Sequence, residues 1–194
     1  YILDSNFDIV ATEDVYESLV WNERYNEPGD FELVIPALAS SIAHIAMDSY
    51  IYIDKSEKFM IVEHQEPYTD VEEGNDILFS GRSLESILDR RIVWQQTTVS
   101  GNAQNAIKKL LTDAIISPTD SSRQISNFIF EDSTDTNVTS LTINETQFTG
   151  DNLLEVVQTL TQGLKIGFKI TVNSSKQFVF KLYAGTDRTK EQIV

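Results

Sequence analysis

Alternation between apolar and polar residues near the start of the chain constrains its fold more than any other feature. In residues 31–35, the apolar Phe31, Leu33 and Ile35 fall on one face of a strand and Glu32 on the other, and in residues 15–21 the apolar residues 15, 19 and 21 share one face with Glu17, as in strands that turn one face to a core. Between them, within WNERYNEPGDFELVIP (residues 21–36), the pair Pro28-Gly29 is a turn signal. Two alternating stretches joined by such a turn predict an antiparallel hairpin.

Further strand-like stretches follow at short intervals and are joined by polar turns. In the first part of the chain they are residues 1–3, 7–11, 50–54, 59–65 and 77–80. Two more, residues 166–172 and 177–183, lie on either side of Asn173-Ser174-Ser175. Many short strands separated by polar turns are typical of a sandwich or a barrel.

Apolar residues at helical spacing interrupt these strands. Three segments carry such spacing: residues 37–47, SLESILDRR (83–91) and residues 102–116. A further helix is predicted to begin at Asp151, whose residue type is favoured at helix N-termini, and to end at Gly163. This order of elements predicts a mixed β fold with an α+β insertion, in which antiparallel β-barrel domains are interrupted by an α/β section.

Three parts of the chain are expected from this order. Residues 1–81 are predicted to form the first β-barrel part and residues 82–165 the inserted α+β section. Residues 166–194 are predicted to supply strands that return to the β body. Because Tyr1 is not a start methionine, we expect the chain to be a fragment of a longer protein.

The composition narrows the classes of partner. The chain has 15 Lys and Arg against 30 Asp and Glu, a formal net charge of −15, which repels phosphate backbones and disfavours nucleic acid as a partner. No apolar run approaches the ~18 residues that a membrane-spanning helix needs. The chain contains no cysteine, so disulfides, thiolate nucleophiles and cysteine-ligated zinc are excluded.

No recognisable catalytic or metal-binding motif is present. His44 lies on the segment 37–47 with Ser41 and Asp48 near it in sequence, and the three would share roughly one helix face. A hydrolytic triad, however, needs an exposed nucleophile beside an oxyanion hole, and no Gly-x-Ser-x-Gly elbow occurs. The acidic run 131–135 lacks the full calcium-loop pattern. We therefore expect no catalytic residue, no metal and no cofactor.

Basic side chains are scarce, so the arginines that bracket SLESILDRR stand out. Arg82 precedes this segment, and Arg90 and Arg91 end it. Two interpretations remain open: bidentate pairs with carboxylates on a neighbouring subunit, or pairs with acids of the same chain. The same choice, between interface and interior, applies to three aromatic residues: Trp21, Tyr25 and Trp94.

Four stretches, taken in order, resemble one known family. They are WNERYNEPGDFELVIP (21–36), IYIDKSEKFMIVEH (51–64), ILFSGRSLESILDRRIV (77–93) and GLKIGFKITVNSSKQFVFKLYAGTDRT (163–189). In order and spacing they resemble the N-terminal domain of phage tail-tip or baseplate hub proteins, the tail-associated lysin family of siphophages and prophages of Gram-positive bacteria. The likeness spans most of the chain.

The resemblance implies a virion structural protein built from small β-barrels with an inserted α/β portion. It implies a homotrimer in which two barrel-type domains per subunit form a pseudo-sixfold ring, matching the sixfold tail tube on one side and a threefold tip on the other. The implied partners are the distal tail protein and other tail-tip proteins, and the implied location is the virion tail tip, after assembly in the host cytoplasm. Many relatives carry a C-terminal cell-wall hydrolase, and none is expected within these residues.

The resemblance also suggests a role for the bend in WNERYNEPGDFELVIP. A bend of this kind suits a loop that packs against a neighbouring subunit, with its base anchored in the barrel. The residues expected at subunit interfaces are Arg24, Tyr25, Asn26, Glu27, Arg82, Arg90 and Arg91. Two other functions remain as alternatives: a wall-degrading enzyme domain, and a carbohydrate- or receptor-binding β module.

Overall fold

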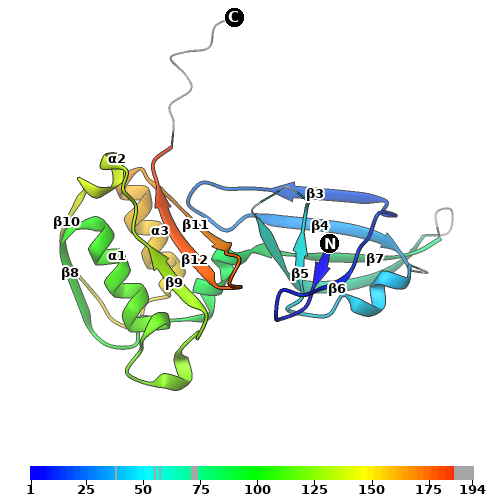
Figure 1. Ribbon diagram of the computed structural model, residues 1–194, viewed down its shortest axis with the longest axis horizontal. Coiled ribbons are helices and arrows are strands. Elements are labelled where there is room, and N and C mark those ends of the chain that lie inside the picture. The colour runs from blue at the N-terminus through cyan, green and yellow to red at the C-terminus, as the bar shows by residue number, and fades with distance from the viewer. Residues whose placement is uncertain (38, 55, 57, 71–73, 186–194) are drawn as a thin grey trace, which may run out of the picture. The chain divides into compact units, whose positions relative to one another are not determined.

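The computed structural model describes residues 1–37, 39–54, 56, 58–70 and 74–185 (Figure 1). The chain folds into two compact units. The first contains Tyr1–Ile87 and Ile170–Phe178, and the second contains Leu88–Lys169 and the residues from Val179 onward. The three parts expected from the sequence, with boundaries at residues 81/82 and 165/166, stay a prediction.

One curled antiparallel sheet of seven strands dominates the first unit (Figure 1), and its order is β2-β1-β5-β6-β7-β4-β3. The strands are β1 (Ile2–Leu3), β2 (Ile9–Ala11), β3 (Ser18–Asn22), β4 (Asp30–Pro36), β5 (Tyr50–Tyr52), β6 (Phe59–Asp70) and β7 (Gly74–Ser83). The sheet is a half-barrel with β2 and β3 at its two ends. The predicted fold class, a mixed β fold with antiparallel barrel-like strands and an α/β section, is confirmed.

The predicted hairpin is present as β3 and β4. Trp21 pairs with Phe31 and Leu19 with Leu33 in antiparallel register, so the alternating residues of both strands point to the same face. Phe31 and Leu33 are almost fully buried, with exposed fractions of 1% and 5%. The alternation that predicted the hairpin therefore corresponds to the buried face of the sheet.

The core of the first unit lies on the concave face of this sheet. The buried residues that form it are Ile2, Phe31, Leu33, Ile35, Ile45, Ile51, Met60, Val62 and Phe79. They come from five strands and from the segment after a 3₁₀ helix, η1 (Ser40–His44). Residues 37–47 therefore form a much shorter helix than their apolar spacing predicted, and Leu38 lies outside the described residues.

The longest strand pair, β6 and β7, requires a glycine at one point. The register of the pair shifts between Val62 and His64, which is the signature of a β-bulge. A Cβ atom on Gly81 would lie 1.8 Å from the carbonyl oxygen of Ile61. Only a residue without a side chain allows the two backbones to approach this closely.

Three α-helices and two small sheets follow in the described residues and lie mainly in the second unit, although residues 170–172 and Phe178 of these strands belong to the first. The helices are α1 (Ala103–Leu111), α2 (Thr136–Thr139) and α3 (Leu153–Leu164). The strands β8 (Thr97–Asn102) and β10 (Thr142–Phe148) form one sheet, and β9 (Phe128–Glu131), β11 (Gly167–Val172) and β12 (Phe178–Tyr183) form the other, in the order β11-β12-β9. In Figure 1 the helices α1 and α3 lie beside the three-stranded sheet.

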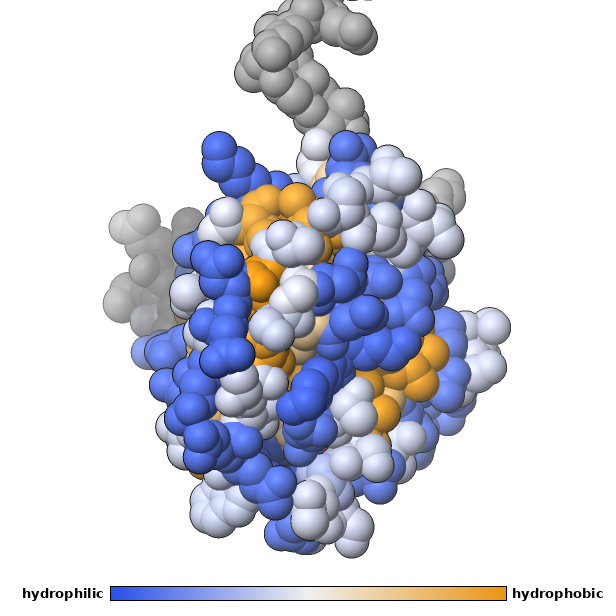
Figure 2. All heavy atoms as spheres, turned by 90° about the vertical axis from the view of Figure 1, so that its left-hand side faces the viewer, coloured by the Kyte–Doolittle hydropathy of each residue, from blue (hydrophilic) through white to orange (hydrophobic). Residues whose placement is uncertain are grey.

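One face of this unit, on the side of β8 and β10, is mainly polar. Figure 2 shows hydrophilic residues over most of the face on the side of β8 and β10, with hydrophobic residues in smaller patches between them. Beneath that surface, α1 buries Ala106, Ile107 and Leu110. The helical spacing predicted for residues 102–116 is present, but the last turn, η3 (Thr112–Ile116), is π-helical.

The ends of α3 differ from the prediction. The N-cap is Asn152 rather than Asp151, since the Oδ1 atom of Asn152 accepts hydrogen bonds from the amides of Leu154 and Glu155, at 2.9 and 3.2 Å. At the other end, Lys165 in the left-handed conformation (φ 57°) ends the helix instead of Gly163.

In the described part of the chain, no helix combines the length and the apolar character that crossing a bilayer requires.

Candidate interaction surfaces

The bend between β3 and β4 is held together by its own side chains. The Nη1 atom of Arg24 donates to the carbonyl of Pro28 at 2.9 Å and lies 2.6 Å from Oδ1 of Asp30. The Nδ2 atom of Asn22 donates to Oδ2 of Asp30 at 3.2 Å. Arg24 therefore fixes the shape of the bend, which explains why an arginine stands there.

The base of the bend is anchored to the end of β7. Gly29 donates its amide to Oγ of Ser83 at 2.8 Å, and the amide of Ser83 donates back to the carbonyl of Gly29 at 3.0 Å. A Cβ atom on Gly29 would lie 2.2 Å from the carbonyl oxygen of Asn22. The close approach of the two backbones accounts for the glycine.

The outer side of the bend carries the remaining predicted interface residues. Tyr25 is 37% exposed, Glu27 is exposed, and Asn26 is half-buried. The rigid bend presents these side chains outward. Their role at an interface stays a prediction.

Arg82 forms an ion pair within its own unit. Its Nε atom lies 2.7 Å from Oε2 of Glu63, and its Nη2 atom lies 3.0 Å from Oε1 of the same carboxylate. This bidentate geometry is the one that guanidinium groups favour with carboxylates. The contact fits the intramolecular alternative for Arg82, and an interface role stays a prediction.

A buried carboxylate lies at the end of β7. Glu85 accepts a short hydrogen bond from Oγ of Ser83 and a second one, at 2.8 Å, from the amide of Ile170. Its exposed fraction is 7%, and desolvation raises the pKa of this carboxyl above its ordinary value although both hydrogen bonds act in the opposite direction. Glu85 therefore joins the end of β7 to β11 through a carboxyl whose pKa is raised by burial.

In the second unit, Arg91 and Arg123 each donate a hydrogen bond to the backbone of the other's segment. The Nε atom of Arg91 donates to the carbonyl of Arg123 at 3.1 Å, and the Nη2 atom of Arg123 donates to the carbonyl of Ile92 at 3.0 Å. Arg91 also donates through Nη1 to the carbonyl of Arg90, at 2.9 Å. A hollow of about 390 Å³ lies against these residues, with Asp89 and Ser122 at its sides.

Trp94 extends the same surface. Its side chain is 66% exposed, and the guanidinium carbon of Arg123 lies 5.2 Å from the centre of a Trp94 ring. This distance is typical of a cation–π contact. Trp94 therefore belongs to the surface, whereas Trp21 is half-buried and packs against the core of the first unit.

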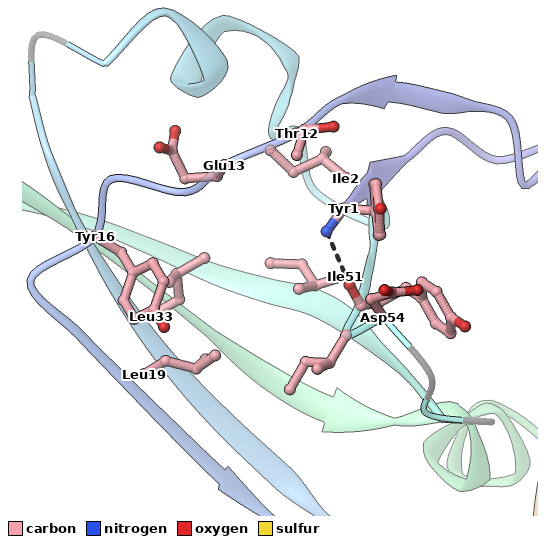
Figure 3. A pocket seen from close by; sticks show the side chains of 11 residues that line it. Tyr1, Ile2, Thr12, Glu13, Tyr16, Leu19, Leu33, Ile51 and Asp54 are labelled. Atoms are coloured by element: carbon pink, nitrogen blue, oxygen red, sulfur yellow. Dashed lines mark hydrogen bonds between the residues drawn. The ribbon is translucent and has the colours of Figure 1, made fainter.

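A pocket opens beside the first strand of the half-barrel (Figure 3). Its volume is about 270 Å³, and Tyr16, Leu19, Leu33 and Ile51 form part of its apolar lining. Figure 3 shows the Tyr1 amino group pointing to the Tyr52 carbonyl, a hydrogen bond of 2.8 Å. The pocket lies on the side of the half-barrel near β1 and β5.

The histidines and acidic clusters show no catalytic geometry in the described residues. His44 is exposed at the end of η1, and Nε2 of His64 lies 3.8 Å from Oε2 of Glu66, with both side chains 63% exposed. In the acidic run 131–135, Asp132 pairs with Lys108 at 2.6 Å. Within the part of the chain that is described, no group of three or more His, Asp or Glu side chains is placed to hold a metal ion.

Two residues of these surfaces were missed by the sequence patterns. Arg123 lies in a stretch rich in serine and aspartate, and nothing in the sequence links it to Arg91. Glu85 has the spacing of an outward-facing residue of an amphipathic helix. It is buried because the 3₁₀ helix η2 (Leu84–Arg90) is enclosed on all sides from Leu84 to Leu88 and not on one face alone.

The curled sheet and the α/β unit together have the fold of phage tail proteins. The family model described as Siphovirus ReqiPepy6 Gp37-like protein matches residues 1–194, and the chain belongs to that family. No protein with a curated functional description matches the chain.

Solved structures of tail proteins share this fold. Prophage tail protein gp18 from Listeria monocytogenes EGD-e matches with a TM-score of 0.58 and 12% identity, over 93% of this chain and 49% of that one. The tail protein from Neisseria meningitidis MC58 matches with a TM-score of 0.56 and 14% identity, over 92% and 49%.

A third structure comes from a secretion system. The E. coli c3393 protein is a component of the type VI secretion system that exhibits structural similarity to T4 tail proteins gp27 and gp5. It matches with a TM-score of 0.53 and 12% identity, over 87% of this chain and 45% of that one. This chain spans about half the length of the three solved structures.

The predicted resemblance to phage tail proteins is thereby confirmed. The family and the shared fold together support a structural component of a phage tail.

Proposed function

We propose that the chain is a hub component of a phage or prophage tail tip, where it links the sixfold tail tube to a threefold tip. The observation that carries this proposal is the agreement of fold with a prophage tail protein over 93% of the chain. In this role the chain acts as a homotrimer. It contacts the distal tail protein and other tail-tip proteins at the end of the virion tail.

Exposed apolar side chains near the ends of the half-barrel support a role in assembly. Ile9, Val15 and Val20 are 60%, 63% and 47% exposed, and all three lie on β2, β3 or the segment between them. A protein that works in contact with others exposes apolar side chains where the contacts form. The strands at the ends of the sheet order also leave backbone groups that a neighbour can pair.

The bend between β3 and β4 is the proposed contact with a neighbouring subunit or tail protein. Because Arg24 is occupied by Pro28 and Asp30, its contribution is to hold the bend rigid. Tyr25, Asn26 and Glu27 then make the contact. Arg82, Arg90 and Arg91 complete the set of proposed interface residues.

The proposed role is non-catalytic. Ser41, His44 and Asp48 are assigned no chemical function, and neither is His64. Zymography on bacterial cell wall tests this part of the proposal: the chain is expected to leave the wall intact, and clearing by the purified chain would contradict it.

Solution mass is the first test of the assembly. Light scattering over a concentration series, on this chain and on the longest natural protein that contains it, is expected to give three times the monomer mass, which for this chain is 22.0 kDa. A monomer in both samples at every concentration would contradict the trimer. Tyr25→Ala combined with Glu27→Ala is expected to weaken assembly, whereas Glu145→Ala, on β10, serves as the matched control.

Location in the virion needs a separate experiment. Gold-labelled antibody against the chain is expected to decorate one end of the tail in electron micrographs of virions that carry it. Label along the tail tube or on the capsid would contradict a tail-tip position.

A further inference from the structure

We propose that the surface formed by Arg91, Arg123 and Trp94 binds the acidic loop of a second copy of this chain. We call the surface formed by these three side chains the basic surface, and we call residues 13–17 the acidic loop. The inference rests on the proposed assembly of several copies and names the residues of one contact within it. Neither the bend nor Arg82 takes part.

The basic surface carries two positive charges that form no close ion pair within the described residues, although the electrostatic interaction of Asp120 with Arg123 helps to lower the pKa of Asp120. Among the described residues, Arg91 and Arg123 donate only to backbone carbonyls, and neither forms an ion pair. Two carboxylates near them are engaged by other groups. Asp89 accepts from Nδ2 of Asn152 at 2.9 Å, and Asp120 accepts from the amide and the hydroxyl of Ser122, at 3.0 and 2.8 Å.

The two guanidinium groups keep donors for a ligand. A guanidinium has five N–H donors, and the structure uses one on Nε and one on Nη1 of Arg91, and one on Nη2 of Arg123. The Nη2 group of Arg91 and the Nε and Nη1 groups of Arg123 remain for acceptors outside the unit. Because the carbonyl contacts already hold both side chains in place, a carboxylate that binds here pays little for ordering them.

Trp94 supplies an apolar contact beside these donors. Among the described residues it is the most exposed of the large hydrophobic side chains, at 66%, and Arg123 stacks over its ring. Tryptophan and arginine are both enriched among the residues that dominate binding energy at protein interfaces. The basic surface therefore calls for a partner that offers carboxylates and apolar side chains side by side.

The acidic loop has this composition. Asp14 and Glu17 are exposed and, among the described residues, form neither an ion pair nor a side-chain hydrogen bond. Between them, Val15 and Tyr16 are 63% and 49% exposed. Glu13 fixes the start of the loop, since its Oε1 atom accepts from the amide of Val15 at 2.8 Å.

The distribution of unpaired charges favours a second copy of the chain as the molecule that supplies the acidic loop. In the acidic run 131–135, two carboxylates are neutralised within the chain: Asp132 pairs with Lys108, and Glu131 with Lys181. Among the described residues, Asp14 and Glu17 of the acidic loop have no such cation, and their two carboxylates match the two guanidinium groups of the basic surface in number and in sign. A contact between two different patches of identical chains is heterologous, and such contacts close into a ring when the rotation between neighbours allows it.

Charge reversal tests the pairing. Arg91→Glu with Arg123→Glu, and separately Asp14→Arg with Glu17→Arg, are each expected to weaken association about tenfold or more in light scattering. The loop variant keeps the test valid if the arginine variant fails to fold, because its two side chains have no partners within the described chain. All four changes in one chain restore opposite charges at the contact and are expected to recover most of the lost association.

The absence of cysteine allows a direct test of contact. Val15→Cys together with Ser122→Cys is expected to give disulfide-linked dimers and larger species on a non-reducing gel, and neither single variant is expected to do so. Glu145→Cys with Ser122→Cys is the matched control. A disulfide within one chain, with no change in mass, would overturn the assignment to a second copy.

The outcomes separate this inference from the proposed function. If the wild-type chain assembles and both charge-reversal variants assemble equally well, the basic surface is not the contact, and the proposed trimer stands. If no sample of the wild type assembles, both are overturned. Loss of assembly in each variant with recovery in the combined variant supports both.

Discussion

At the scale of single residues, Glu85 is the most informative side chain in the first unit. It is buried, yet it accepts hydrogen bonds from Ser83 and from the amide of Ile170. Removing an acceptor from such a site leaves buried donors unsatisfied, and each costs about 1–3 kcal/mol. The carboxyl therefore stabilises the unit through its hydrogen bonds and destabilises it through its charge.

The opposing effects predict a specific pH dependence. Because the pKa of Glu85 is raised above its ordinary value of 4.5, the folded state binds more protons than the unfolded state between the two pKa values. The stability of the wild type therefore falls as the pH rises through this window. Glu85→Gln keeps an acceptor for Ile170 and removes the titration, so the stability of the wild type relative to this variant is expected to increase as the pH falls.

Denaturant unfolding from pH 4 to pH 8 measures this difference. Asp4 and Asp120 have lowered pKa values, the first through a hydrogen bond from the amide of Asp8 and the second through hydrogen bonds from Ser122. The contribution of each carboxylate to the stability of the protein is therefore lost as the pH falls. Both residues are present in the wild type and in Glu85→Gln, so their contribution cancels in the comparison. A constant difference between the two proteins across the range would contradict the buried titration.

Two glycines, one in a close strand contact and one on an exposed helix position, give a paired prediction. Gly81→Ala places a Cβ atom against the Ile61 carbonyl, and overpacking of this kind costs about 1–3 kcal/mol. Gly163→Ala in α3 meets no atom within 4 Å and is expected to add about 0.5–1 kcal/mol through helix propensity. Equal midpoints of thermal unfolding for the two variants would show that the close approach of β6 and β7 is tolerant.

At the scale of elements, the N-terminus of α3 depends on one side chain. Asn152 accepts from two amides of the first turn and donates to the backbone carbonyl and the Oδ1 atom of Asp89, at 3.2 and 2.9 Å. Asn152→Ala is expected to lower the free energy of unfolding by about 1–2 kcal/mol. Asn152→Ser retains a capping oxygen and is expected to recover part of that loss in urea unfolding, and no recovery would mean that the contact with Asp89 dominates.

Strands and helices of the chain were predictable where one face is buried. The alternation in 31–35 and the helical spacing in 102–116 both record the side that faces a core, so they predicted β4 and most of α1. Strand β8 (Thr97–Asn102) escaped prediction because only Thr97 and Val99 are buried in it. Asp and Asn are both favoured at the N-cap of a helix. Residue type therefore does not distinguish Asp151 from Asn152, and the pattern predicted Asp151.

Interaction surfaces were less accessible from the sequence. Arg90 and Arg91 stood out because basic residues are rare, but Arg123 joins them only through the folding of residues 117–127 back onto the segment 91–92. Patterns within a short window cannot reveal such a contact. The role of Arg24 in closing the bend was likewise hidden, because its partners are a backbone carbonyl and a carboxylate on the far side of the turn.

At the scale of the whole molecule, the net charge of −15 opposes the local charge of the basic surface. The field of the whole chain is expected to exclude nucleic acid, since binding to a phosphate backbone requires more cations than two arginines provide. A 30-base-pair duplex is expected to show no mobility shift with the chain at low salt. A shift that disappears in Arg91→Glu with Arg123→Glu would mean that the basic surface accepts phosphate.

The half-barrel ends in two strands, β2 and β3, that pair on one side only within the described chain. Each is a template on which another extended segment can lie, and the template does not distinguish the correct neighbour from a misplaced one. The time that a copy spends with these edges unpaired therefore determines how often a wrong segment can pair with them. An unassembled copy is expected to be prone to pairing at these edges, and the net negative charge is expected to oppose such pairing less as the pH approaches the pI of about 4.4. Rapid assembly with the correct neighbour and a neutral or alkaline pH are therefore expected to limit aggregation through these edges.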